Sequence, residues 1–226
     1  MAKEKLYKDL PRPKLNRASI REIYSRLLAF GPKPETDLEY RDAYTLVVAV
    51  ALSAQSTDVG VNKCTRKLFP IASTPQAMVD LGEEAVREHI KTIGLYRNKA
   101  KNVIALSRMI LDEFGGEVPR TRDELIRLPG VGRKTANVVL NEAFGQPTMA
   151  VDTHIFRVAN RTGMAPGKDV VEVELNLLRV TPEDYRLPAH HLLLLHGRYT
   201  CLARKPKCYD CRIADICRYK PKTPPP

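Results

Sequence analysis

Residues 128–160 read LPGVGRKTANVVLNEAFGQPTMAVDTHIFRVAN, and this stretch decides the fold. Pro129 ends one helix, and Gly130 and Gly132 permit a tight backbone turn. A second helix is predicted over residues 133–144, because apolar side chains recur at helical spacing, at Ala136, Val139, Leu140 and Ala143. The stretch therefore predicts a helix-hairpin-helix, at about residues 123–145. The start of its second helix presents unpaired backbone N–H groups, which suit a phosphate.

Lys134 and Asp152 are candidates for chemistry beside this hairpin. Lys134 lies one residue into the second helix, on its polar side with Asn137 and Asn141. That helix is roughly 16–18 Å long, and residues 145–151 can span up to ~23 Å, so the chain can return alongside it. Asp152 is then expected as the N-cap of a helix over residues 153–160. Alone, the lysine indicates a solvated surface residue and the aspartate a cap, but together they occupy the places that nucleophilic amine chemistry on DNA requires.

Four of the five cysteines lie in the segment CLARKPKCYDCRIADIC, as Cys201, Cys208, Cys211 and Cys217. A structural zinc site usually builds on two separated Cys-x2-Cys pairs. One pair flanked by two single cysteines instead favours a four-thiolate iron–sulfur cluster. The fifth, Cys64, is expected to pack as a small apolar residue.

The loop between the first two of these cysteines carries Arg204, Lys205 and Lys207. Because metal ligands would hold both ends of the loop, it can present charge rigidly to a phosphate backbone. Solvated charge on a tight loop is the alternative.

Composition indicates a globular protein with a polyanionic partner. A chain of 226 residues can bury one large core or two small ones, and 43% hydrophobic content excludes a mainly disordered protein. The net charge of +11 favours a polyanion, although a merely basic protein would also carry it. No apolar run has the length of a membrane span or of a signal-peptide core, so we expect no membrane association and a cytoplasmic, nucleoid-associated protein.

Every other predicted element is also helical, so the fold class is all-α. Residues 1–17 are expected to form a flexible basic arm, residues 32–39 a linker and residues 220–226 a Pro-rich tail. Ser19 and Glu22 indicate a capping box, Asp58 a further N-cap, and Thr121 with Glu124 the start of the short helix before the hairpin. The other helices are expected over residues 42–53, which are apolar all round, and over 83–91, 97–114, 169–180 and 189–200.

Residues 19–217 closely resemble the endonuclease III family of DNA glycosylases. The resemblance lies in the hairpin, the lysine, the returning aspartate and the spacing of the cysteines. The resemblance implies that Lys134 attacks C1′ of a damaged nucleoside to form a Schiff base. Asp152 would assist the attack and the opening of the sugar ring. Gln55 and Leu95 would fill the space left by the extruded nucleotide. From the residues alone, Gln55 is a polar loop residue, and Leu95 is either a core plug or an exposed wedge.

The same resemblance implies two helical domains flanking a DNA-binding cleft. Residues 35–146 would form one domain, and residues 18–34 with 147–219 would form the other, which holds a [4Fe–4S] cluster on the four cysteines. The expected DNA contacts are Gln55, Leu95, the hairpin residues Gly130, Val131, Gly132, Arg133 and Thr135, and the loop residues Arg204, Lys205 and Lys207.

The sequence thus predicts a bifunctional DNA glycosylase and AP lyase of base excision repair. It would act as a monomer on double-stranded DNA that contains damaged pyrimidines or abasic sites. Two alternatives stay open: a monofunctional adenine-mismatch glycosylase, against which Lys134 argues, and a non-enzymatic iron–sulfur DNA-binding protein.

Overall fold

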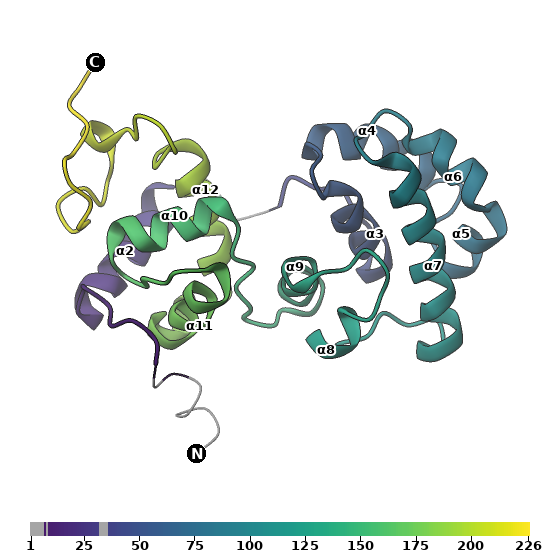
Figure 1. The fold of residues 1–226 in the computed structure, drawn as a ribbon, viewed down its shortest axis with the longest axis horizontal. Helices are drawn as coiled ribbons and strands as arrows, with labels where there is room; N and C mark the ends of the chain where they lie inside the picture. The colour runs from purple at the N-terminus through teal and green to yellow at the C-terminus, as the bar shows by residue number, and fades with distance from the viewer. Residues whose placement is uncertain (1–6, 8, 32–35) are drawn as a thin grey trace. The chain divides into compact units, whose positions relative to one another are not determined.

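The computed structural model describes residues 7, 9–31 and 36–226, and every regular element in them is a helix (Figure 1). The prediction of an all-α fold is therefore confirmed. The chain folds into two compact units. The central unit is Thr36–Gln146, and the terminal unit joins Met1–Glu35 to Pro147–Pro226. Residues 1–6 and 8 of the expected arm and residues 32–35 of the expected linker lie outside the described residues.

The central unit is built around α3 (Ala43–Ser53). All residues from Tyr44 to Leu52 are buried, because this helix is apolar on every side and packs against α4, α7 and α9. Asp42 caps it, with a side-chain oxygen 2.8 Å from the backbone N of Thr45. The remaining helices of this unit are α4 (Asp58–Leu68), α5 (Pro75–Leu81), α6 (Glu83–Ile90), α7 (Tyr96–Phe114), α8 (Arg122–Leu125) and α9 (Arg133–Phe144).

The terminal unit has its own apolar core, to which α2 contributes Ile23, α10 contributes Ile155 and α12 contributes Leu193. Ile213, which lies among the four clustered cysteines, is also fully buried in this core, so the cysteine segment is anchored to it. The elements are α2 (Arg17–Phe30), α10 (Thr153–Thr162), α11 (Val170–Val180), η1 (Glu183–Tyr185), α12 (Ala189–Tyr199) and η2 (Cys208–Asp210). No described helix combines the length and apolar character that a membrane span requires.

Several helix boundaries differ from the prediction. The cap of α2 is Asn16, whose side-chain oxygen accepts a 2.8 Å hydrogen bond from the N–H of Ser19, so the predicted Ser19 capping box is wrong. The cap of α4 is Thr57 and not Asp58. Helix α8 ends at Leu125, four residues before Pro129, and the chain reaches the proline through tight turns. Where several polar residues adjoin a helix start, each can cap it, and local pattern alone does not choose among them.

The prediction of a flexible arm is wrong for residues 9–17. The N–H of Lys14 donates to the carbonyl of Gly163 at 2.8 Å, and the Asn176 side chain donates to the carbonyl of Pro11 at 3.0 Å. Leu15 is only 7% exposed and packs in the core of the terminal unit. These partners are distant in sequence, so the basic, proline-containing composition of the segment gave no sign of them.

This packing predicts a stability effect for Leu15→Ala. Truncating a buried leucine removes apolar burial and leaves a cavity, so the free energy of unfolding should fall by about 2–4 kcal/mol. Urea denaturation measures the change, and Arg12→Ala, at an exposed position of the same segment, is the matched control. Equal stabilities for the two variants would contradict the packing.

Candidate functional site

The hairpin turn is a tight bend centred on Gly130. This residue has φ +79°, and a Cβ atom on it would lie 3.0 Å from the side-chain nitrogen of Asn102 on α7, so both the backbone and the neighbour require glycine. A Cβ on Gly132 would meet nothing within 4 Å. Gly132 is the N-cap of α9 and provides no side-chain acceptor. The first N–H groups of α9, which have no carbonyl partner within their own helix, therefore begin beside open space.

Three residues near the turn are more buried than the sequence led us to expect. Val131 is buried, and its N–H donates to the carbonyl of Leu128 at 3.0 Å, so neither its side chain nor its N–H supports the prediction that Val131 contacts DNA. Asn137 and Asn141, expected on a polar side with Lys134, are buried. The Asn141 side chain donates to the carbonyl of Gln146 at 3.2 Å, which offsets the cost of its burial.

Lys134 and Asp152 each stand at the start of a helix. Lys134 is the second residue of α9, and its side chain is exposed. Asp152 is half-buried and caps α10, as predicted: its Oδ1 accepts 2.9 Å hydrogen bonds from the N–H groups of His154 and Ile155. Its Oδ2 takes part in neither bond. The lysine belongs to the central unit and the aspartate to the terminal unit.

Gln55 and Leu95 lie on two loops of the central unit, after α3 and before α7. Both are exposed, Leu95 by 56%, which excludes the core-plug interpretation of this leucine. Both also have left-handed backbone conformations, with φ +55° and +57°. Residues other than glycine rarely adopt this conformation, and it is often retained at functional sites.

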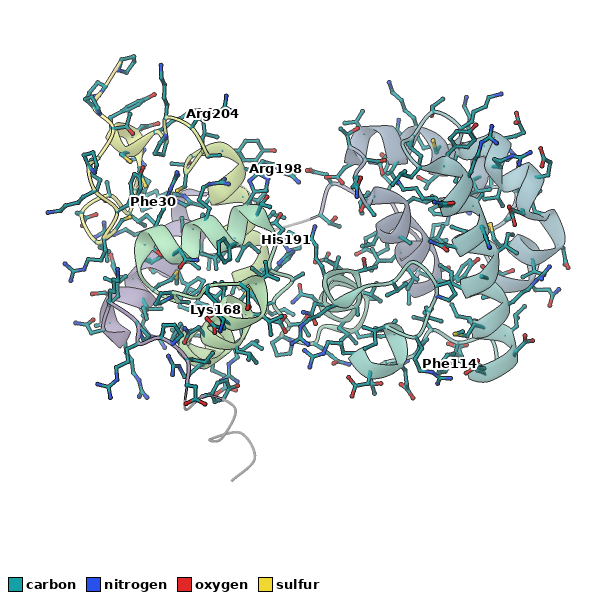
Figure 2. The ribbon with its side chains drawn as sticks, viewed as in Figure 1. Phe30, Phe114, Lys168, His191, Arg198 and Arg204 are labelled. Carbon is teal, nitrogen blue, oxygen red and sulfur yellow. The ribbon has the colours of Figure 1, made fainter. Side chains whose placement is uncertain are left out.

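The basic loop belongs to the terminal unit, where Figure 2 labels Arg204. Arg204, Lys205 and Lys207 are all exposed, whereas Pro206 between them is buried. Lys205 has φ +49° and is the third described non-glycine residue with a positive φ. The N–H of Lys207 donates to the carbonyl of Thr200 at 2.9 Å, which closes the loop on the end of α12.

All four clustered cysteines line one pocket, together with Pro206, Ile213 and Ala214. Burial is the main reason that the pKa of the Cys211 thiol is raised to about 11, and the three neighbouring cysteine thiols contribute to the same rise. The described His, Cys, Asp and Glu side chains form no group of three or more gathered around a single ion. Cys64 is buried in the central unit, with its Sγ 3.3 Å from the hydroxyl of Thr92, as expected for a packing residue.

Two arginines that were not expected from the sequence hold the cysteine loop on α10. Arg157 donates to the carbonyl of Cys201 at 2.8 Å. Arg161 donates to the carbonyl of Leu202 at 2.6 Å and lies 3.6 Å from the Cys201 sulfur. Their i, i+4 spacing was the only signal in the sequence, and a solvated helix face carries the same spacing.

Comparison with known proteins covers most of the chain. Residues 48–183 match the model of the HhH-GPD superfamily base excision DNA repair protein. The chain is 57% identical to endonuclease III of Escherichia coli strain K12 over 92% of its own length and 99% of that protein. Identity to endonuclease III of Haemophilus influenzae is 56%, with the same coverage of each chain. A solved structure of a trapped endonuclease III–DNA covalent intermediate superimposes with a TM-score of 0.84 at 44% identity, covering 90% of this chain and 96% of the other.

Proposed function

The chain belongs to the endonuclease III family of base excision DNA repair proteins, and from this premise we propose how its own residues act. It is a DNA glycosylase with AP lyase activity, and its partner is DNA. We propose that its substrates are oxidised pyrimidines and abasic sites in duplex DNA. We also propose that it acts in the cytoplasm, on the DNA of the nucleoid. The observation that carries the proposal is an exposed lysine in the first turn of a helix whose N-terminus has no side-chain cap.

We propose that the N-terminus of α9 binds a DNA phosphate next to the damaged nucleotide. The N–H groups of a helix start carry partial positive charge, and the glycine at the cap lets an anion approach closely. Gly130, Gly132, Arg133 and Thr135 stay candidates for this contact. Such a contact positions the strand without reading its sequence, so it suits an enzyme that must examine any stretch of duplex.

We propose that Lys134 is the nucleophile. Its amine attacks C1′ of the nucleotide, the bond from C1′ to the base breaks, and the base leaves with the bonding electron pair. The attacking nitrogen then loses a proton, the C1′–O4′ bond breaks, and O4′ takes up a proton, so that the sugar ring opens and a Schiff base joins Lys134 to C1′. The Schiff base allows a proton to be removed from C2′, after which the 3′ phosphate leaves by β-elimination. Asp152 would stabilise the positive charge that develops on the sugar. A monofunctional adenine-mismatch glycosylase would have no use for this lysine.

We propose that Cys201, Cys208, Cys211 and Cys217 hold a [4Fe–4S] cluster. Four thiols that line one shared pocket supply the four-cysteine donor set that such a cluster requires. Arg161 beside the Cys201 sulfur could donate to a thiolate ligand. When bound, the cluster would cross-link the two ends of the basic loop and so hold its three cations in place.

The cluster proposal predicts roughly four irons and four acid-labile sulfides per chain in brown, anaerobically prepared protein. Cys208→Ala should lower the iron content because it removes a ligand, whereas Cys64→Ala, in the other unit, should leave it unchanged. Zinc without iron or sulfide would contradict the proposal of a [4Fe–4S] cluster, but it would not bear on the glycosylase activity.

The basic loop predicts a change in the salt dependence of DNA binding. Lys205→Ala should weaken binding to damaged and undamaged duplex similarly and lower the slope of log affinity against log salt by about one unit. The control is Lys168→Ala, which removes one positive charge from an exposed position of the same unit (Figure 2). A loss confined to damaged DNA, or an unchanged slope, would show that Lys205 contacts no phosphate.

The nucleophile proposal predicts the result of borohydride trapping. Wild-type protein incubated with duplex DNA containing an oxidised pyrimidine should form a covalent adduct, because borohydride reduces the imine to a stable amine. Lys134→Gln should abolish both trapping and strand cleavage while lesion binding persists. Lys63→Gln, at an exposed position on α4, should behave as wild type.

Asp152→Asn separates the chemistry of the aspartate from its role as a cap. Asparagine caps a helix as well as aspartate does, so α10 should begin unchanged while the negative charge is lost. We expect turnover to slow at least tenfold, as single-turnover rates would show.

A Lys134→Gln protein that trapped and nicked at the wild-type rate would refute the proposal that Lys134 is the nucleophile.

A further inference from the structure

The loops that carry Gln55 and Leu95 are in direct contact. We call residues 54–57, between α3 and α4, and residues 92–95, between α6 and α7, the paired loops (Figure 1). A Cβ on Gly94 would lie 3.6 Å from the carbonyl oxygen of Gln55. At the base of the loops, the Cys64 sulfur lies 3.3 Å from the Thr92 hydroxyl. The two exposed side chains therefore project from one structural unit.

Lys99 joins the paired loops to each other. It lies in the first turn of α7, and its backbone N–H donates to the carbonyl of Leu95 at 3.0 Å. Its ammonium donates to the hydroxyl of Ser56 at 2.8 Å. One residue thus bonds to the immediate neighbour of Gln55 and to Leu95 itself.

The burial of Lys99 lowers the stability of the fold, so stability does not explain why a lysine occupies this position. The residue is only 6% exposed, and within the described part of the chain it forms no ion pair. Burial lowers the pKa of this ammonium, which reflects the cost of removing the charge from water. A methionine of similar length would fill the same space without that cost. What the lysine adds is the bond across the paired loops.

We propose that Lys99 is a positioning residue that holds Gln55 and Leu95 in register, so that both side chains enter the duplex together when the damaged nucleotide leaves the stack. This inference rests on the proposed function, because it takes from it the roles of the two inserted side chains. Lys99 itself touches no reacting atom. Its effect is to order two loops before DNA binds, so that binding energy is not used to align them.

The test replaces the ammonium and keeps the length of the side chain. Lys99→Met should unfold thermally at the wild-type temperature or above. Single-turnover excision of an oxidised pyrimidine from duplex DNA should slow between about 10- and 100-fold. A 2-aminopurine placed opposite the lesion should show less of the fluorescence rise that accompanies unstacking. Lys101→Met, on the exposed side of α7, is the control and should match wild type in all three measurements.

A double-mutant cycle assigns the effect to the bond. Ser56→Ala should slow excision in the same direction, and adding it to Lys99→Met should cause little further loss, because both changes remove one interaction. Wild-type excision and fluorescence in Lys99→Met would overturn the inference, as would a lowered melting temperature with an unchanged fluorescence rise. If the wild-type protein excised no damaged base, the proposed function itself would be overturned. The reaction of the wild-type protein therefore tests the proposed function separately from the role of Lys99.

Discussion

The N-cap of helix α9 is a glycine that provides no side-chain acceptor, and the function that we propose depends on this constraint. A helix start leaves several N–H groups without partners in its own helix, and proteins usually satisfy them with a side chain. Here Gly130 turns the chain through a left-handed conformation against Asn102, and Gly132 leaves the space before the helix open. In the mechanism that we propose, a DNA phosphate completes this arrangement and brings the strand to Lys134 in the first turn.

The same principle holds at the other expected DNA contacts. The three described non-glycine residues with positive φ are Gln55, Leu95 and Lys205, and each belongs to those contacts. A left-handed residue other than glycine costs roughly 1–2 kcal/mol, so such a conformation persists only when the surrounding structure maintains it. The surroundings are visible in both units: Lys99 bridges the paired loops, and Arg161 holds the cysteine loop on α10. In our proposal, these conformations cost stability but hold the side chains in place before DNA binds.

How far the sequence predicts this protein depends on whether a feature is local. The Pro129 and Gly130 turn, the Asp152 cap and the helix α3 that is apolar all round follow from residues close together in the chain, and the structure has all three. The caps of α2 and α4 were predicted wrongly because several adjacent polar residues could each have formed the cap. The other features that were predicted wrongly or missed depend on distant partners: Leu15 is fixed by the core of the terminal unit, and Lys99 by a serine on another loop. Nothing adjacent to Gln55 or Leu95 marks them as left-handed, because glycine is the only strong sequence signal for that conformation.

The proposed mechanism requires that the amine of Lys134 forms the covalent bond to DNA. The most direct test is to reduce the wild-type protein–DNA adduct with borohydride, digest it with a protease, and locate the modified residue by tandem mass spectrometry. We expect a sugar remnant on the side chain of Lys134 and on no other amine. A remnant on another lysine or on the N-terminal amine, with Lys134 unmodified, would contradict it.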